Sequence, residues 1–241
     1  MINRQGTKRR IAHKIIPLFP EHKTYIEMFF GGGGMFFKKP KAKYNIVNDI
    51  DDDVYNLFCV IQNDKDRLLE YMKSIPIHET LFKHWAKNKE TEPIKKATRF
   101  LFLATTSLYA DYKTMQIKLV DSMWATQCGK IDYVNSFMDG VKFVKKDFRI
   151  FFSDITSRGQ KEFDTSFIYA DPPYIQTNSK GYCGFSKDDT ADLFDVLMAS
   201  GMRFAISEYD HPFVLELAKK HGLNVHIIGE VQAIKKRNTE I

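Results

Sequence analysis

The sequence predicts an α/β protein with a mostly parallel sheet, built from both ends of the chain and interrupted by a helical insertion. Strand and helix patterns alternate in residues 1–60 and again in residues 150–241, whereas residues 61–149 show helical spacing. The chain has 241 residues, 44% of them hydrophobic, which is ample for a large core. The middle segment is also the most basic, with 16 Lys and Arg against 11 Asp and Glu.

The first sixty residues alternate helix and strand signals. Residues 10–19 have helical spacing, and residues 24–30 have the pattern of a buried strand that runs into four glycines. Residues 44–48 form a second strand, and residues 51–63 form a helix whose positive end carries three aspartates. A strand, a glycine loop, a second strand and an acid therefore follow one another, an order typical of α/β proteins.

The rest of the chain continues this pattern after the insertion. Helices are predicted within the insertion over residues 64–75, 78–88 and 93–109, and no strand alternation is visible there. From about residue 150, the predicted strands are residues 149–154, 165–171, 203–208 and 223–230, and the predicted helices are residues 188–200 and 211–222.

Charge and composition narrow the classes of function. Of the net charge of +6, the segment 61–149 carries +5, which suits a polyanion, although a solvated lysine-rich surface explains it equally well. No apolar run approaches the roughly 20 residues that span a bilayer, and no export signal is visible. Three widely spaced cysteines give neither a disulfide framework nor a metal-ligand spacing. We therefore expect a cytoplasmic protein with no membrane segment and no metal.

The glycine loop indicates a nucleoside site. Gly31 to Gly34 follow the first strand, where glycine lets the backbone approach a ligand closely. Asp49 ends the second strand, where a carboxylate accepts both hydroxyls of a ribose. The third spaced glycine of a dinucleotide fingerprint is missing, and apolar Phe29 and Phe30 flank the loop. A nucleoside joined to a non-phosphate tail is favoured over NAD, although a tight turn explains the glycines alone.

The stretch YADPPY, residues 169–174, places a carboxylate, two prolines and a ring directly after an apolar strand. The exocyclic nitrogen of adenine is a poor nucleophile because its lone pair is delocalised into the ring. Asp171 and the carbonyl of Pro172 offer hydrogen-bond acceptors that direct this lone pair out of the ring plane. Tyr174 offers a face for base stacking, worth about 1–3 kcal/mol. The stretch therefore predicts methylation of an aromatic amine, in preference to an ordinary proline turn.

These motifs resemble, over nearly the whole chain and in the same order, the Dam-type (alpha-class, D12) DNA adenine-N6 methyltransferases, which use S-adenosylmethionine. GTKRRIAHKIIPLFP resembles the N-terminal cofactor motif, YIEMFFGGGGMFF the glycine motif and YADPPY the catalytic motif. Met28 stands where that family usually has proline. The resemblance implies a Rossmann-like methyltransferase sheet, with a catalytic domain of residues 1–60 and 150–241 and a basic helical DNA target-recognition insert of residues 61–149.

The resemblance also assigns roles to individual residues. The predicted catalytic residues are Asp171, Pro172 and Tyr174. The predicted cofactor-binding residues are Arg4, Lys8, Glu27, Phe29, Gly31, Gly33, Asp49, Asp154 and Asp171. The predicted DNA contacts are Lys95, Lys96, Arg99, Tyr109, Lys113 and Tyr182. For the basic cluster at residues 95–99 a solvated helix face is an equally good interpretation, and for Tyr182 a plain surface loop.

The predicted activity is transfer of a methyl group from S-adenosylmethionine to N6 of an adenine flipped out of double-stranded DNA, with no metal and no obligate protein partner. The same motif logic also serves cytosine N4, adenine in RNA or a protein glutamine amide. A DNA-binding protein that has lost catalysis is the alternative from another class. A bacterial or phage-encoded enzyme is expected, and a solitary regulator, a restriction partner and a phage enzyme protecting its own DNA stay open.

Overall fold

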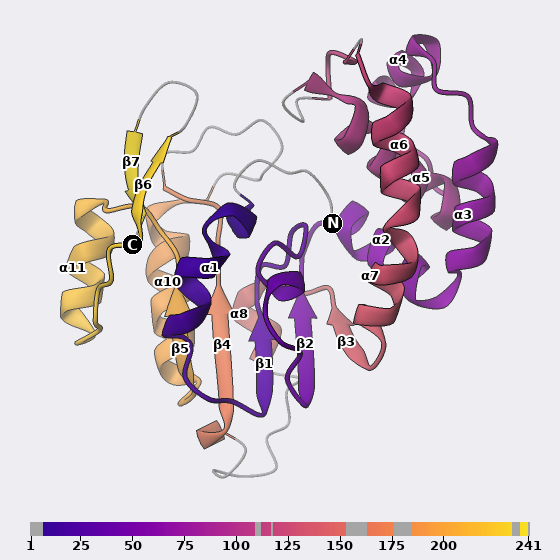
Figure 1. The fold of residues 1–241 in the computed structure, drawn as a ribbon. Helices are drawn as coiled ribbons and strands as arrows, with labels where there is room; N and C mark the ends of the chain where they lie inside the picture. Colours follow the sequence, from indigo (N-terminus) through magenta and orange to yellow (C-terminus); the bar gives the residue numbers. More distant parts are fainter. Residues whose placement is uncertain are drawn as a thin grey trace.

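The fold, shown as a computed structural model in Figure 1, is centred on a parallel sheet. The structure describes residues 7–108, 112–116, 118–152, 163–175, 185–232 and 237–240. In the described residues the sheet has five strands in the order β3-β2-β1-β4-β5, all parallel. The strands are β1 Thr24–Glu27, β2 Tyr44–Asn48, β3 Val141–Val144, β4 Ser166–Ala170 and β5 Arg203–Ile206. This order is Rossmann-like, so the predicted α/β fold class is confirmed.

Alternation along the strands divides the core into two layers. Tyr25 packs in a cluster on one face of the sheet, and its neighbour Ile26 packs in a second cluster on the other. The helical elements of the chain ends are η1 Lys8–Arg10, α1 Ala12–Ile15, η2 Ile16–Leu18, η3 Phe36–Lys38, α2 Asp52–Asn63, α8 Phe148–Phe151, α10 Lys187–Ala199 and α11 Pro212–Lys220. α1 and α2 cover the Tyr25 face, and α8 and α10 cover the Ile26 face.

The middle segment forms a helical unit beside the β3 edge of the sheet (Figure 1). Its helices are α3 Lys65–Ser74, α4 Glu79–Lys87, α5 Pro93–Thr106, α6 Val120–Gly129 and α7 Ile131–Met138. α5 begins with Pro93 at its first position, is buried along most of its length and packs against α2, α3, α4 and α6. The Phe102 ring of α5 contacts Trp85 and Trp124 at centroid distances of 5.3 and 5.5 Å. Both tryptophans are buried in the packing of this unit, whereas its DNA-recognition role stays a prediction.

Two predicted elements around residue 150 are wrong. The described part of the predicted strand, residues 149–152, is not a strand, because Asp147 caps a helix through the Arg149 amide and the α8 residues Phe148 and Phe151 bury one helical face. The edge strand is instead β3, within the segment that was predicted to be helical throughout. Four residues are too few for alternation to be recognised in the sequence.

The predicted strand over residues 223–230 is also wrong. Gly222 ends α11 with a φ of +66°, as expected, but residues 223–228 form no strand. Val225 and Ile227 of this run are 46% and 75% exposed, so these apolar side chains do not belong to a buried strand of the core. The chain then pairs β6 Gly229–Gln232 with β7 Arg237–Glu240 as a separate antiparallel ribbon (Figure 1).

Candidate active site

Three acidic residues meet at the carboxyl edge of the sheet. Glu27 is the last residue of β1, Asp49 directly follows β2, and Asp171 directly follows β4. Since the three strands are parallel and adjacent, their carboxyl ends lie together. Their charges interact, because Asp171 and Asp49 both raise the pKa of Glu27. The structure therefore brings Asp171 together with two acids that precede it by more than a hundred residues in the chain.

Lys8 joins Asp171 and Tyr174 in one cluster. The Lys8 Nζ lies 2.8 Å from Asp171 Oδ1 and 4.3 Å from the centroid of the Tyr174 ring. Lys8 is 6% exposed, so its ammonium group is directed into the protein and not toward solvent. Burial raises the pKa of Asp171, while the Lys8 charge and hydrogen bonds from Lys8 and Tyr174 lower it. Lys8 thus favours the ionised carboxylate in a site that otherwise opposes it.

Tyr209 packs against Tyr174 and was not predicted as a site residue. The two rings meet edge to face, with centroids 4.5 Å apart and planes at 80°. Ser207 donates its backbone N–H to Ala170 O at 2.9 Å, and the Tyr209 N–H is accepted by Glu208 Oε1 at 2.9 Å. The first bond holds the end of β5 beside the end of β4, and the second is local to the chain that follows β5. Because Tyr209 is separated from Tyr174 by a helix and a strand, no local sequence pattern could have indicated the contact.

Asp49 closes the glycine loop. Its Oδ2 accepts the Gly31 N–H at 2.6 Å and its Oδ1 accepts the Asp51 N–H at 2.9 Å. Gly31 has a φ of +53°, and nothing lies within 4 Å of the position that a Cβ would occupy. Open space therefore borders the backbone at Gly31, as expected where a ligand approaches the chain closely.

Gly33 has a packing role in the same loop. With a φ of +68°, a Cβ on Gly33 would lie 2.4 Å from Phe37 Cε2 and 2.9 Å from Phe30 Cζ. Both rings are buried, so they have little room to move. The geometry gives Gly33 a reason to be glycine without any ligand, and its predicted contact with the cofactor stays a prediction.

We expect alanine substitutions at Gly31 and Gly33 to lower the unfolding free energy by different amounts. Gly31→Ala carries only the left-handed backbone cost of about 1–2 kcal/mol. Gly33→Ala adds overpacking against two rings, for a total of about 2–5 kcal/mol of unfolding free energy. Urea unfolding of both variants measures the difference. Equal losses would show that the Phe37 contact does not constrain the loop.

Asn48, the last residue of β2, joins the ends of three strands by hydrogen bonds, and it was not predicted from the sequence as a site residue. Its Nδ2 donates to Met28 O and Lys146 O, both at 3.0 Å, and its Oδ1 accepts the Lys146 N–H at 2.9 Å. The side chain is 2% exposed. Buried amide groups require such partners, so Asn48 fixes the chain after β1 and β3 beside Asp49.

Glu27 lies in a buried polar chain with two residues that the sequence did not mark. Tyr25 donates its hydroxyl hydrogen to Glu27 Oε2 at 2.8 Å, and the Lys39 Nζ lies 4.1 Å from the Tyr25 ring centroid. Burial raises the pKa of Glu27 from 4.5 to about 8, and burial lowers the pKa of Lys39 to about 8. Tyr25 and Glu27 share a sheet face because they are two residues apart, which is the signal that could have identified Tyr25.

The pKa of Glu27 predicts a pH dependence of stability. A raised folded-state pKa stabilises the protein below the unfolded value of 4.5, and this contribution is lost as the pH rises to about 8. We expect the unfolding free energy of the wild type, relative to Glu27→Gln, to fall between pH 5 and 8 by up to about 1.4 kcal/mol per pH unit. Lys39 is charged in both states below its own pKa of about 8 and adds no slope there. A difference between the two proteins that stays constant with pH would contradict the assignment.

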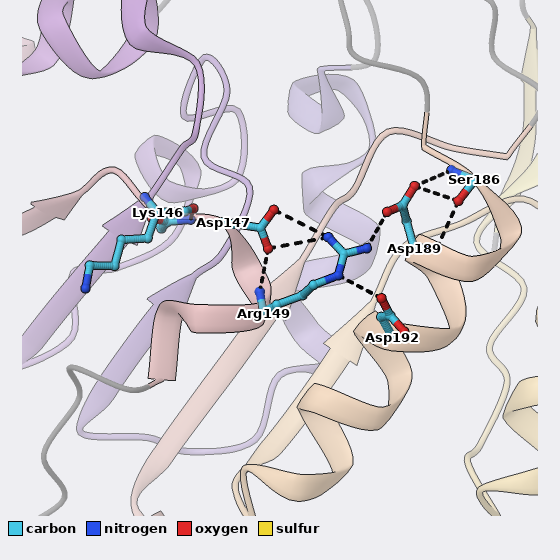
Figure 2. Close-up of polar contacts among 7 residues, drawn as sticks. Lys146, Asp147, Arg149, Ser186, Asp189 and Asp192 are labelled. Carbon is cyan, nitrogen blue, oxygen red and sulfur yellow. Dashed lines mark hydrogen bonds and ion pairs between the residues drawn. The ribbon is translucent and has the colours of Figure 1, made fainter.

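An arginine-centred cluster positions the chain that follows the catalytic stretch (Figure 2). Arg149 of α8 pairs with Asp189 and with Asp192 of α10, the latter at 2.7 Å. Ser186 and Asp189 form a reciprocal capping box at the start of α10. The preceding Phe185 ring contacts Phe29 and Phe148 at centroid distances of 6.0 and 5.7 Å. The start of α10 is therefore held near the glycine loop.

The predicted DNA contacts on α5 are largely engaged inside the protein. Lys96 pairs with Asp52, and the Arg99 Nε donates to Trp85 O and Asn88 O at 2.8 and 2.7 Å. Arg99 is 9% exposed, whereas Lys95 and Lys113 are exposed. Predicted site residues that lie outside the described residues are Arg4, Tyr109, Asp154 and Tyr182.

The described part of the chain contains neither a metal-binding group of side chains nor a helix suited to span a membrane. It contains no group of three or more His, Cys, Asp and Glu side chains placed to hold a metal ion. None of its helices combines the length and the apolar character needed to cross a membrane.

The chain is similar in sequence to known methyltransferases. A family model described as "D12 class N6 adenine-specific DNA methyltransferase" matches residues 5–234. Type II methyltransferase M.MjaIII of Methanocaldococcus jannaschii is 25% identical over 222 residues, or 82% of this chain and 77% of that protein. DNA adenine methylase of Haemophilus influenzae is 28% identical over 201 residues, or 74% and 66%. The solved rRNA methyltransferase aviRa of Streptomyces viridochromogenes aligns over 97% of this chain and 84% of that chain, with 9% identity and a TM-score of 0.40.

Proposed function

Because this chain belongs to the D12 class of N6 adenine-specific DNA methyltransferases, we propose that it transfers a methyl group from S-adenosylmethionine to N6 of an adenine flipped out of double-stranded DNA. The observation that carries the proposal is the cluster of Lys8, Asp171 and Tyr174, in which a partly buried carboxylate is held beside an aromatic ring at the sheet's carboxyl edge. The relatives named type II methyltransferase and DNA adenine methylase support DNA as the substrate.

Asp171 and Pro172 would activate the amino group. The adenine N6 donates one hydrogen bond to the Asp171 carboxylate and one to the Pro172 carbonyl, which directs its lone pair toward the methyl donor. Two consecutive prolines fix the backbone after β4, so the two acceptors are already placed before the base arrives. N6 must also lose a proton during the reaction, and Asp171, whose pKa is raised by burial, is placed to receive it.

Tyr174 would provide the stacking surface for the flipped base. Its ring is 8% exposed and is covered partly by Lys8 and by Tyr209. A base that stacks on this ring must therefore displace one of these two neighbours. Stacking worth about 1–3 kcal/mol offsets part of the cost of taking the base out of the duplex.

The residues around the glycine loop fit S-adenosylmethionine. The open space beside the Gly31 backbone admits a ligand, and the Asp49 carboxylate suits the hydroxyls of a ribose. Glu27 and Asp171 offer negative charge to a cationic ligand. The cofactor, when bound, supplies an electrophilic methyl group. A cation beside Glu27 lowers the pKa of this carboxyl, so we propose that binding expels a proton from it.

A product analysis tests the proposal. The purified chain is incubated with methyl-labelled S-adenosylmethionine and, in separate reactions, DNA, RNA and protein, and each polymer is digested to its monomers. We expect label in N6-methyladenine from DNA. Label in N4-methylcytosine, in RNA or in a glutamine amide would contradict the assignment. Cofactor binding without transfer to any DNA would favour a DNA-binding protein that lacks catalysis.

A further inference from the structure

Three cations, two of the predicted DNA contacts and the lysine of the catalytic cluster, are engaged by other protein groups. Lys96 is engaged with Asp52, Arg99 is buried against backbone carbonyls, and Lys8 is paired with Asp171. A nucleotide whose base reaches Asp171 nevertheless brings its own phosphates to the same edge of the sheet. Protein groups that bind those phosphates must therefore lie close to Lys8, and they must carry a positive charge that no carboxylate neutralises.

Arg9 and Arg10 meet both conditions. They directly follow Lys8 in the 3-10 helix η1, and both are exposed while Lys8 is buried. Across the part of the chain that the structure describes, no carboxylate pairs with either guanidinium group. Figure 1 shows this first part of the chain, in indigo, above the carboxyl ends of β1 and β4. The two charged residues are thus adjacent in sequence to Lys8, whose ammonium group contacts Asp171.

The backbone that carries the two arginines is fixed. A Cβ on Gly34 would lie 2.5 Å from Thr7 Oγ1 and 3.3 Å from the backbone nitrogens of Lys8 and Arg9, so this segment lies directly on the glycine loop. Further along, Ala12 and Ile15 are buried in the core. Binding of a ligand then has to order the two arginine side chains but not the backbone that carries them.

We propose that Arg9 and Arg10 form a phosphate-binding site for the DNA backbone next to the flipped nucleotide. This inference depends on the proposed function, since it takes DNA to be the substrate. A guanidinium group carries a permanent charge and a fork of N–H donors that matches phosphate oxygens. Lys8 then lies beside the reacting base, while Arg9 and Arg10 bind the phosphates of the DNA strand. One turn of η1 therefore links the positioning of the base to the binding of the DNA backbone.

The salt dependence of DNA binding tests the inference. We would measure the Kd of the full chain for a duplex between 50 and 200 mM salt, for the wild type and for R9A/R10A. Each phosphate contact contributes about 0.9 to the slope of log Kd against log salt, so the slope should fall by about 1.8. Over this fourfold range of salt, the wild type should therefore lose about twelvefold more affinity than the variant.

A matched control removes the same charge elsewhere. Lys23 and Lys43 are exposed and directly precede β1 and β2, at the opposite edge of the sheet. K23A/K43A should keep the wild-type slope, and R9K/R10K should keep most of it. Cofactor binding without DNA checks that each variant is folded.

The outcomes separate this inference from the proposed function. If R9A/R10A and K23A/K43A have the same slope, Arg9 and Arg10 do not bind phosphate, even where the wild type methylates adenine. If the wild type transfers no methyl group to DNA, the proposed function fails, and that result comes from the product analysis and not from the binding slopes.

Discussion

Asp171→Ala lowers the rate of methyl transfer by about 10²- to 10⁴-fold, the range over which a positioned acid or base contributes to catalysis. The substitution removes the acceptor proposed to hold the adenine amino group and leaves Lys8 without its carboxylate partner at 2.8 Å. Binding of duplex DNA should change little, because the proposed phosphate contacts lie elsewhere. Single-turnover rates with saturating DNA and cofactor measure the effect on the chemical step alone.

The isosteric variant Asp171→Asn is the control for shape. It keeps the volume of the side chain and one oxygen acceptor, but it has no negative charge to pair with the Lys8 ammonium group and cannot accept a proton. We expect it to be nearly as impaired as alanine. Wild-type rates in either variant would refute the proposed role of Asp171, whereas a parallel loss of DNA affinity would indicate a structural defect.

Lys8→Met lowers the rate at neutral pH by about 10- to 100-fold, the factor that corresponds to a charge-assisted hydrogen bond of about 1.5–3 kcal/mol. Burial raises the pKa of Asp171, and the Lys8 charge is the largest influence that lowers it. Without Lys8 the carboxyl stays protonated to higher pH. If activity requires the carboxylate, as proposed, the acid limb of the pH profile of kcat/KM should move to higher pH.

Lys8→Arg is the matched comparison for this prediction. An arginine keeps the positive charge near Asp171, so the acid limb should stay closer to that of the wild type. If Lys8→Met lowers the rate equally at every pH, Lys8 does not act through the ionisation of Asp171. If Lys8→Met raises the KM for the cofactor and leaves the pH profile unchanged, the role of Lys8 is to bind the cofactor and not to ionise Asp171.

Much of the central sheet follows from local patterns. Residues 44–48 and the buried part of 165–171 were predicted where β2 and β4 lie, because parallel strands buried on both faces have continuous apolar runs. β3 was missed because four residues give too short an alternation. Residues 223–230 were misassigned because an apolar run does not reveal whether it is buried, and here it is largely exposed.

The candidate site was predictable only where its residues lie within motifs. Asp171 and Tyr174 share one stretch of sequence, and the resemblance to a family supplied Lys8. Tyr209 and Asn48 contact the site through pairings that depend on the order of strands in the sheet, which is fixed by tertiary packing. Lys39 is buried against Tyr25, although lysine composition alone suggests a solvated surface.

Charge counts identified a basic segment but not the cations available to a ligand. Lys96 and Arg99 contribute to the positive excess of residues 61–149, yet internal partners engage both. Arg9 and Arg10 lie in a part of the chain whose charge is nearly balanced, and they are exposed beside the site. Whether a charge is free depends on neighbours that only the fold brings together.

The nucleoside composition of cellular DNA tests the central claim most directly. The wild-type chain and Asp171→Ala are expressed separately in a host that lacks adenine methylation, and the DNA is digested and analysed by mass spectrometry. We expect N6-methyladenine with the wild type and none above background with the variant. N6-methyladenine at equal levels with both proteins, or its absence with the folded wild type, would contradict the claim.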